Sequence, residues 1–117
     1  MSGAVSYHAG KCAEDCVAQL YVTTGQQVVA RRWRGTAGEI DVIARDGDEL
    51  VFIEVKKSRT HAEAASHLSE RQMKRIWQTA SEYLGSEPLG QDSLARFDVA
   101  LVDDGGRIEI LQNAFAA

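Results

Sequence analysis

The sequence predicts an α/β fold in which a mixed central β-sheet carries a helix on each face, with elements in the order αβββαββ. Two amphipathic helical patterns, at about 7–24 and 69–84, alternate with segments of strand character. The apolar run 51–53 is typical of a central strand buried on both sides. A helix before a hairpin-rich sheet, and a second helix that returns to more strands, together favour this class.

The first helix is expected because apolar residues recur at steps of three and four positions, and Gly25 follows at a C-cap position. The recurring residues are Ala13, Cys16, Val17, Leu20 and Tyr21. The segment "QQVVARRW" then indicates a short strand, and "RGTAG" a loop.

The next segment predicts a β-hairpin with strands at about 39–45 and 49–57. Gly47 and Asp48 can form its two-residue turn, which pairs Asp46 with Glu49. A looser loop is expected over 58–68. Side chains alternate along a strand, so the turn also fixes which residues face one another further out.

The second helix is expected to begin with the capping-box pattern "SERQ" and to end at Gly85. Its apolar stripe is Met73, Ile76, Trp77, Ala80, Tyr83 and Leu84. "SEPLGQDS" indicates a loop, and two last strands, at about 95–103 and 107–115, flank the turn "DDGG".

Length and composition indicate a single domain, 1–117, of a globular protein. The chain has 117 residues, 44% of them hydrophobic and 26% charged. It lacks an apolar run near the ~20 residues that span a bilayer and lacks the basic and apolar regions of a secretory signal. We therefore expect a cytoplasmic protein without a membrane partner.

The charges of the hairpin are unusual for strands built from core residues. Counting outward from the turn places Asp41 opposite Glu54 and Glu39 opposite Lys56, on one face that also carries Ile43, Leu50 and Phe52. Two carboxylates about 5 Å apart repel each other. A divalent cation such as Mg²⁺, or a proton on one carboxyl group, would resolve the conflict. A polar face held together by ordinary ion pairs is the alternative interpretation.

Asp41, a gap of twelve residues and then Glu54-Val55-Lys56 resemble the signature of the PD-(D/E)XK nucleases, which have the restriction-endonuclease-like fold. Over nearly its full length the chain also resembles the small bacterial YraN-like proteins. The matching features are Glu14 in the first helix after Gly10, "GEIDVIA", "VFIEVK", Lys74-Arg75-Ile76, "RFDV" and "NAF". The archaeal Holliday-junction resolvases are similar at a greater distance.

The resemblance implies a Mg²⁺-dependent (or Mn²⁺-dependent) endonuclease acting on DNA, in branched or single-stranded form. Asp41 and Glu54 would then hold the metal together with the backbone carbonyl of Val55, and Lys56 would orient or deprotonate a water or stabilise transition-state charge. Glu14 resembles the extra acidic residue of that superfamily, although its spacing equally fits a solvated helix flank. Glu39 is expected either to contact the metal-holding residues without touching the metal or to form an ion pair with Lys56.

Several basic residues are candidates for contact with nucleic acid: Arg31, Arg32, Arg34, Lys57, Arg59 and Lys74. Solvated surface charge is the alternative for each of them. The net charge of −4 argues against a protein that coats nucleic acid, and it favours a weak binder or a homodimer. A nucleic-acid-binding or adaptor domain that keeps the nuclease fold without catalysis is the second functional hypothesis.

Overall fold

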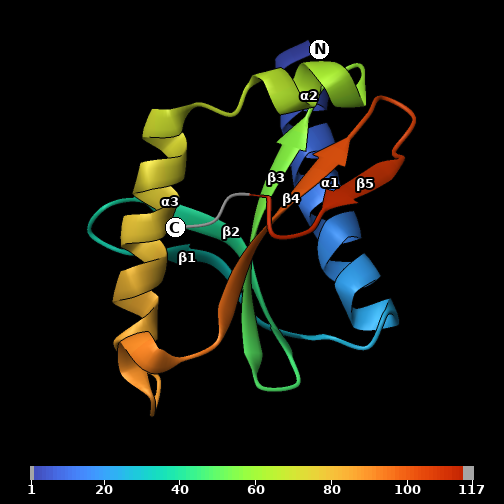
Figure 1. Ribbon diagram of the computed structural model, residues 1–117. Helices are drawn as coiled ribbons and strands as arrows, with labels where there is room; N and C mark the ends of the chain where they lie inside the picture. Colours follow the sequence, from blue (N-terminus) through green and yellow to red (C-terminus); the bar gives the residue numbers. More distant parts are fainter. Residues whose placement is uncertain (1, 115–117) are drawn as a thin grey trace.

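The computed structural model describes the backbone of residues 2–114 and the side chains of residues 12–114. Its elements are α1 (Ser2–Thr23), β1 (Gln27–Arg34), β2 (Glu39–Asp46), β3 (Glu49–Lys57), α2 (His61–Ser66), α3 (Glu70–Leu84), a 3₁₀ turn (Gly90–Asp92), β4 (Ala95–Val102) and β5 (Ile108–Leu111). The strands form one sheet in the order β1-β2-β3-β4-β5 (Figure 1). The β3–β4 pair is parallel and the other pairs are antiparallel, so the predicted mixed sheet is confirmed.

The two faces of the sheet are covered by different helices (Figure 1). Val17 and Tyr21 of α1 pack on Val42, Ile53 and neighbouring small residues of β2–β4. On the other face, α3 packs against β2, β3 and β4 through Ile76, Ala80 and Leu84, which meet Ile40, Ile43, Leu50, Phe52 and Phe97. The expected helix on each face is therefore present, because each helix has one apolar stripe to bury.

The loop predicted over 58–68 is wrong in part, because it contains α2. Thr60 caps this helix by accepting a hydrogen bond from the Glu63 amide, and Ala64 packs on Val99 and Leu101 of β4. The sequence "THAE" has the same spacing as a capping box, so this helix start carried a readable signal. The predicted last strand also ends earlier than expected, at Leu111, and position 115 lies outside the described residues.

Strict alternation of side chains fails at the start of β2. Ile40 packs in the layer under α3, whereas Val42 and Ala44 pack under α1, although all three would share a face in a regular strand. The strand therefore turns between Ile40 and Val42, which is where Asp41 lies. Among the described residues, no helix is long and apolar enough to cross a membrane.

Candidate active site at the fork between β2 and β3

Asp41 lies where β2 and β3 separate. Their register runs from Asp46 opposite Glu49 to Val42 opposite Ile53, as predicted, and its continuation would place Asp41 opposite Glu54. The recorded pairing ends before that step. The backbone amide of Val55 instead donates a hydrogen bond to Oδ2 of Asp41, at 2.8 Å.

The carbonyl of Val55 faces the same fork as its amide. In a strand, the N–H and C=O groups of one residue lie on the same edge, and the amide of Val55 points toward Asp41. The backbone oxygen expected to help hold a metal thus lies on the same edge as the Asp41 carboxylate.

Glu54 is held in place by two side chains. Its carboxylate is buried, with 8% of the residue exposed. Nε2 of Gln72 in α3 donates to Oε2 of Glu54 at 2.6 Å, and Nζ of Lys56 lies 3.5 Å from the same oxygen. Both of these contacts are made to Oε2.

Burial and mutual repulsion disfavour ionisation of both carboxyl groups. Burial, followed by the negative charge of Asp41 and a hydrogen bond to it, raises the pKa of Glu54 to about 8, against a partial opposing effect of Lys56. Burial also raises the pKa of Asp41; the Val55 amide opposes this shift and the charge of Glu14 adds to it. A proton or a cation between the two groups relieves the conflict.

Glu14 comes close enough to influence Asp41 although it belongs to α1, but it already has a partner. Its Oε1 accepts a hydrogen bond from Nε of Arg32 at 3.0 Å. Arg32 lies between Arg31 and Trp33, which pair with Val42 and Ile40, so it stands across from Asp41 on β1. Its φ of 50° is in the left-handed region, which is uncommon for a residue other than glycine.

Glu39 lies outside this cluster. It pairs with Arg34 at 3.1 Å, whereas the ion pair recorded for Lys56 is with Glu54. The expected pairing of Glu39 with Lys56 is therefore replaced by two local pairs, because the strands separate before their ladder reaches these residues.

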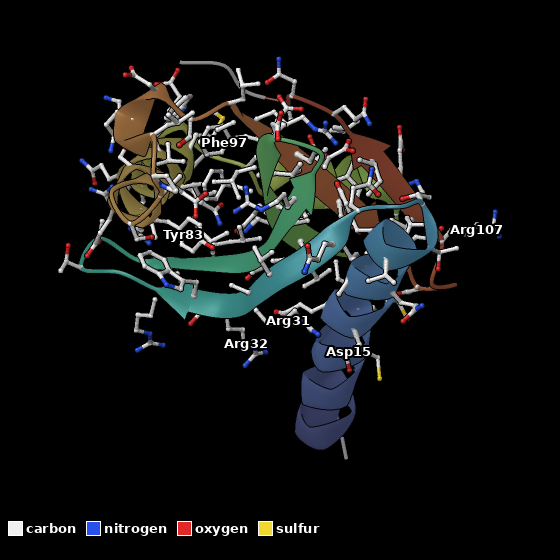
Figure 2. The ribbon with its side chains drawn as sticks, turned by 90° about the horizontal axis from the view of Figure 1, so that it is seen from below. Asp15, Arg31, Arg32, Tyr83, Phe97 and Arg107 are labelled. Atoms are coloured by element: carbon white, nitrogen blue, oxygen red, sulfur yellow. The ribbon has the colours of Figure 1, made fainter. Side chains whose placement is uncertain are left out.

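The basic residues proposed from the sequence to contact nucleic acid fall into two groups, those that form an ion pair with a carboxylate and one that lines a groove. Arg31 points toward Asp15 of α1, at 2.7 Å, and Arg32 lies beside it (Figure 2). Lys57 and Arg59 pair with Asp104 and Glu63. Lys74 is different: it is exposed on α3 and lines a groove.

Gln72 is the site residue that sequence reasoning missed. Its place in the capping box is confirmed, because its amide donates to Oγ of Ser69 at 3.1 Å. Its side chain, however, leaves the helix end and contacts β3. The packing of α3 on the sheet brings the two side chains together, and the only local signal for the contact is a long amide side chain in the first turn of the helix.

The donor set suits a hard cation with a small number of protein ligands. Among the described side chains, no group of three or more His, Cys, Asp or Glu residues is arranged to hold a metal ion. Two carboxylates and a carbonyl fit Mg²⁺, which keeps several waters and binds one or two carboxylates together with substrate phosphates. Asp41, Glu54 and the carbonyl of Val55 are therefore the residues that could hold it.

Fold and site define a class: a mixed α/β protein with paired carboxylates and a lysine at the fork of a central hairpin. Within that class the chain belongs to the Uncharacterised protein family UPF0102, whose sequence model matches residues 13–102. This confirms the YraN-like family expected from the sequence.

Relatives match all or nearly all of the chain. A UPF0102 protein of Cereibacter sphaeroides (strain KD131) is 63% identical over 117 residues and is covered completely, as is this chain. A UPF0102 protein of Ruegeria pomeroyi is 55% identical over 97% of this chain and 92% of its own length. Another from Ruegeria sp. (strain TM1040) is 43% identical over 97% of this chain and 91% of its own.

Proposed function

We propose that this protein is a Mg²⁺-dependent endonuclease of the PD-(D/E)XK superfamily that hydrolyses phosphodiester bonds in DNA. The observation that carries the proposal is the pair of carboxylates formed by half-buried Asp41 and buried Glu54, whose pKa values are raised beside Lys56. Carboxyl groups whose pKa values are shifted by burial together with a specific charge partner mark a candidate functional site.

Each residue has a role that follows from its contacts. Asp41 and Glu54 would hold the cation with the Val55 carbonyl, and Gln72 would fix the orientation of Glu54. A bound Mg²⁺ supplies a Lewis acid for the phosphate and a more acidic water. In hydrolysis a water oxygen bonds to phosphorus, the bond to the leaving oxygen breaks and that oxygen takes up a proton. The ammonium group of Lys56 can donate to the phosphate oxygens as negative charge develops.

A cleavage assay with matched variants tests this proposal. Single-stranded, duplex and four-way DNA are incubated with Mg²⁺, Mn²⁺ or a chelator. We expect Asp41→Asn and Lys56→Ala each to lower the rate by about 100-fold or more, as loss of a group that stabilises a transition state does. Asp48→Asn, in the exposed hairpin turn, is the control and should cleave like the unaltered chain. Equal cleavage by all four proteins would identify a contaminant and refute the proposal.

A non-catalytic nucleic-acid-binding or adaptor protein is the second candidate. This candidate is favoured because charged residues of the site already form ion pairs with each other or with neighbours: Lys56 pairs with Glu54, and Glu14 pairs with Arg32. A purely structural ion-pair cluster would have such contacts as well. Binding of DNA without metal-dependent cleavage in the same assay would support this candidate.

A further inference from the structure

The cations of this protein are distributed unevenly between paired and unpaired positions. Among the described side chains, residues 12–114, nearly every lysine and arginine lies within 4.0 Å of a carboxylate. The exceptions in that range are Arg71, Lys74 and Arg75. All three are exposed and belong to the N-terminal half of α3.

These three cations line one groove. Its volume is about 400 Å³, and its walls are Ala37, Glu70, Arg71, Lys74, Arg75 and Gln78. With one carboxylate among three cations, the groove has a formal charge of +2, although the whole chain has −4. It is therefore a local positive surface on an acidic protein.

The loop that forms the other wall is fixed against α3. The backbone amide and the hydroxyl of Thr36 both donate to Oε2 of Glu82, at 2.8 and 3.2 Å. Gly38 lies so close to Arg75 that an added Cβ would be 2.8 Å from its Cδ. The loop can be followed beside α3 in Figure 1. The groove is thus built by contacts on both sides of Ala37.

The positions of the cations are unfavourable for the helix itself. Arg71 and Arg75 are four residues apart, a spacing at which like charges repel. Positive charge in the first turn also opposes the helix dipole. Glu70, in the first turn and four residues before Lys74, offsets only part of this repulsion, and a bound anion would relieve the rest.

The groove adjoins the candidate active site through the helix. Gln72, whose side chain reaches Glu54, is next to Arg71 in sequence and about 60° around the helix from Arg75. Arg71 and Arg75 are four residues apart, or about 6 Å along the helix axis, and Lys74 is adjacent to Arg75 in sequence. A row of positive charges at this spacing suits the repeating phosphates of a nucleic-acid strand.

From these contacts we infer that the groove between α3 and the β1–β2 loop binds the sugar–phosphate backbone of the DNA strand next to the scissile phosphate. This inference rests on the proposed function for the identity of the polymer, but not for the presence of catalysis. It moves the DNA contact away from Arg31, Arg32, Arg34, Lys57 and Arg59, which have carboxylate partners.

DNA binding by the full chain, measured by fluorescence anisotropy in a chelator at several salt concentrations, tests the inference. Single-stranded, duplex and four-way DNA serve as probes. Arg71→Gln/Arg75→Gln is compared with Arg45→Gln/Arg107→Gln, in which both arginines have carboxylate partners elsewhere on the surface. Each double variant lowers the net charge by the same two units, so bulk electrostatics are matched.

The groove variant should bind all probes more weakly, and the slope of log K against log salt should become shallower by roughly 0.7–0.9 for each lost phosphate contact. Adding Lys74→Gln to the groove variant should make the slope shallower by the amount expected for one more lost phosphate contact. The control should keep the slope of the unaltered chain. Urea unfolding curves of the control and of the groove variant show whether both are folded.

The outcomes separate this inference from the proposed function. Three outcomes would overturn the inference that the groove binds DNA. They are an equal loss of slope in both double variants, an unchanged slope in the groove variant, and no binding by the unaltered chain. Cleavage that depends on Asp41 could still be present in the first two cases. A slope lost only in the groove variant, without cleavage by any protein, would support the groove and refute the nuclease.

Discussion

Ionisation of the two carboxyl groups at the fork, Asp41 and Glu54, is energetically unfavourable. Among the described side chains, neither Asp41 nor Glu54 forms an ion pair with an arginine, and the amide of Val55 and the ammonium of Lys56 only partly offset burial and repulsion. A group that only stabilised the fold would gain more from a full ion pair, since an uncompensated buried charge is destabilising. This imbalance distinguishes the fork from the other acidic residues of the chain.

The pKa of Glu54 predicts a pH-dependent stability. Because its pKa rises from the ordinary 4.5 to about 8 on folding, the folded state favours the protonated carboxyl group. The contribution of Glu54 to the free energy of unfolding should therefore be fully present at pH values below about 4.5. This contribution should be lost as the pH rises toward 8. Urea unfolding of the chelator-treated protein between these values measures the decline.

Glu54→Gln should remove this part of the pH dependence, because the amide does not titrate and has a similar shape. Asp48→Asn should leave it unchanged. Under the proposed function, saturating Mg²⁺ should also reduce the decline in the unaltered chain. The same decline in Glu54→Gln and in the unaltered chain would assign the pH dependence to other groups.

At the scale of elements, local signals predicted the hairpin and α3 well. The two-residue turn at Gly47 and Asp48 fixes the register, and a one-residue slip would expose the core face, so Asp46 had to pair with Glu49. The stripe of α3 and its Ser69 cap are equally local features. They could be predicted because few positions in the sequence determine them.

Contacts that depend on tertiary packing could not be predicted in the same way. The turn of β2 at Ile40, the contact of Gln72 with Glu54 and the carboxylate partners of the basic residues arise only when the helices are docked on the sheet. For α2 the reason is different. A six-residue helix gives too short a periodic pattern, so its cap was the only usable local signal.

That cap predicts a measurable effect on stability. Oγ1 of Thr60 accepts a hydrogen bond from the amide of Glu63, at 3.1 Å. Thr60→Ala should lower the free energy of unfolding by about 1 kcal/mol, because it leaves a helix amide without its partner. Thr60→Ser keeps an acceptor and is the matched control. Equal urea midpoints for the two variants would show that the cap contributes nothing.

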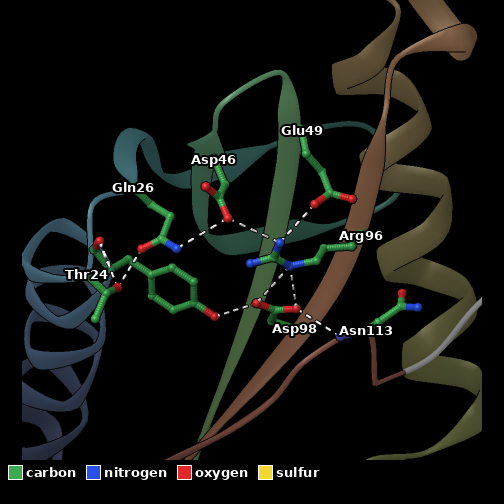
Figure 3. Close-up of polar contacts among 8 residues, drawn as sticks. Thr24, Gln26, Asp46, Glu49, Arg96, Asp98 and Asn113 are labelled. Atoms are coloured by element: carbon green, nitrogen blue, oxygen red, sulfur yellow. Dashed lines mark hydrogen bonds and ion pairs between the residues drawn. The ribbon is translucent and has the colours of Figure 1, made fainter.

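Over the whole molecule, one polar network joins segments that are distant in sequence. Asp98 is fully buried on β4, and it accepts hydrogen bonds from Tyr21 of α1, from Arg96 and from the backbone amide of Asn113. Arg96 also contacts Asp46 and Glu49, at the two ends of the hairpin turn (Figure 3). The network therefore links the first helix, the hairpin and the end of the chain.

Within this network, Asp98 and Arg96 depend on each other. The side chain of Asp98 has no exposed area and that of Arg96 is 15% exposed, so removal of the carboxylate would leave a partly buried guanidinium with only Asp46 and Glu49 as partners. Asp98→Ala should cost about 3–5 kcal/mol of unfolding free energy in urea. Tyr21→Phe should cost about 1–3 kcal/mol, because the carboxylate keeps its other donors.

The two substitutions also test whether the network acts as one unit. Tyr21 and Asp98 are in direct contact, at 2.7 Å, so their effects should not add. Once Asp98 is alanine, the tyrosine hydroxyl has lost its acceptor, and Tyr21→Phe should then cost less than it does in the unaltered chain. Strictly additive costs in the double variant would mean that α1 is held on the sheet by apolar packing alone, with the Tyr21 hydrogen bond contributing nothing.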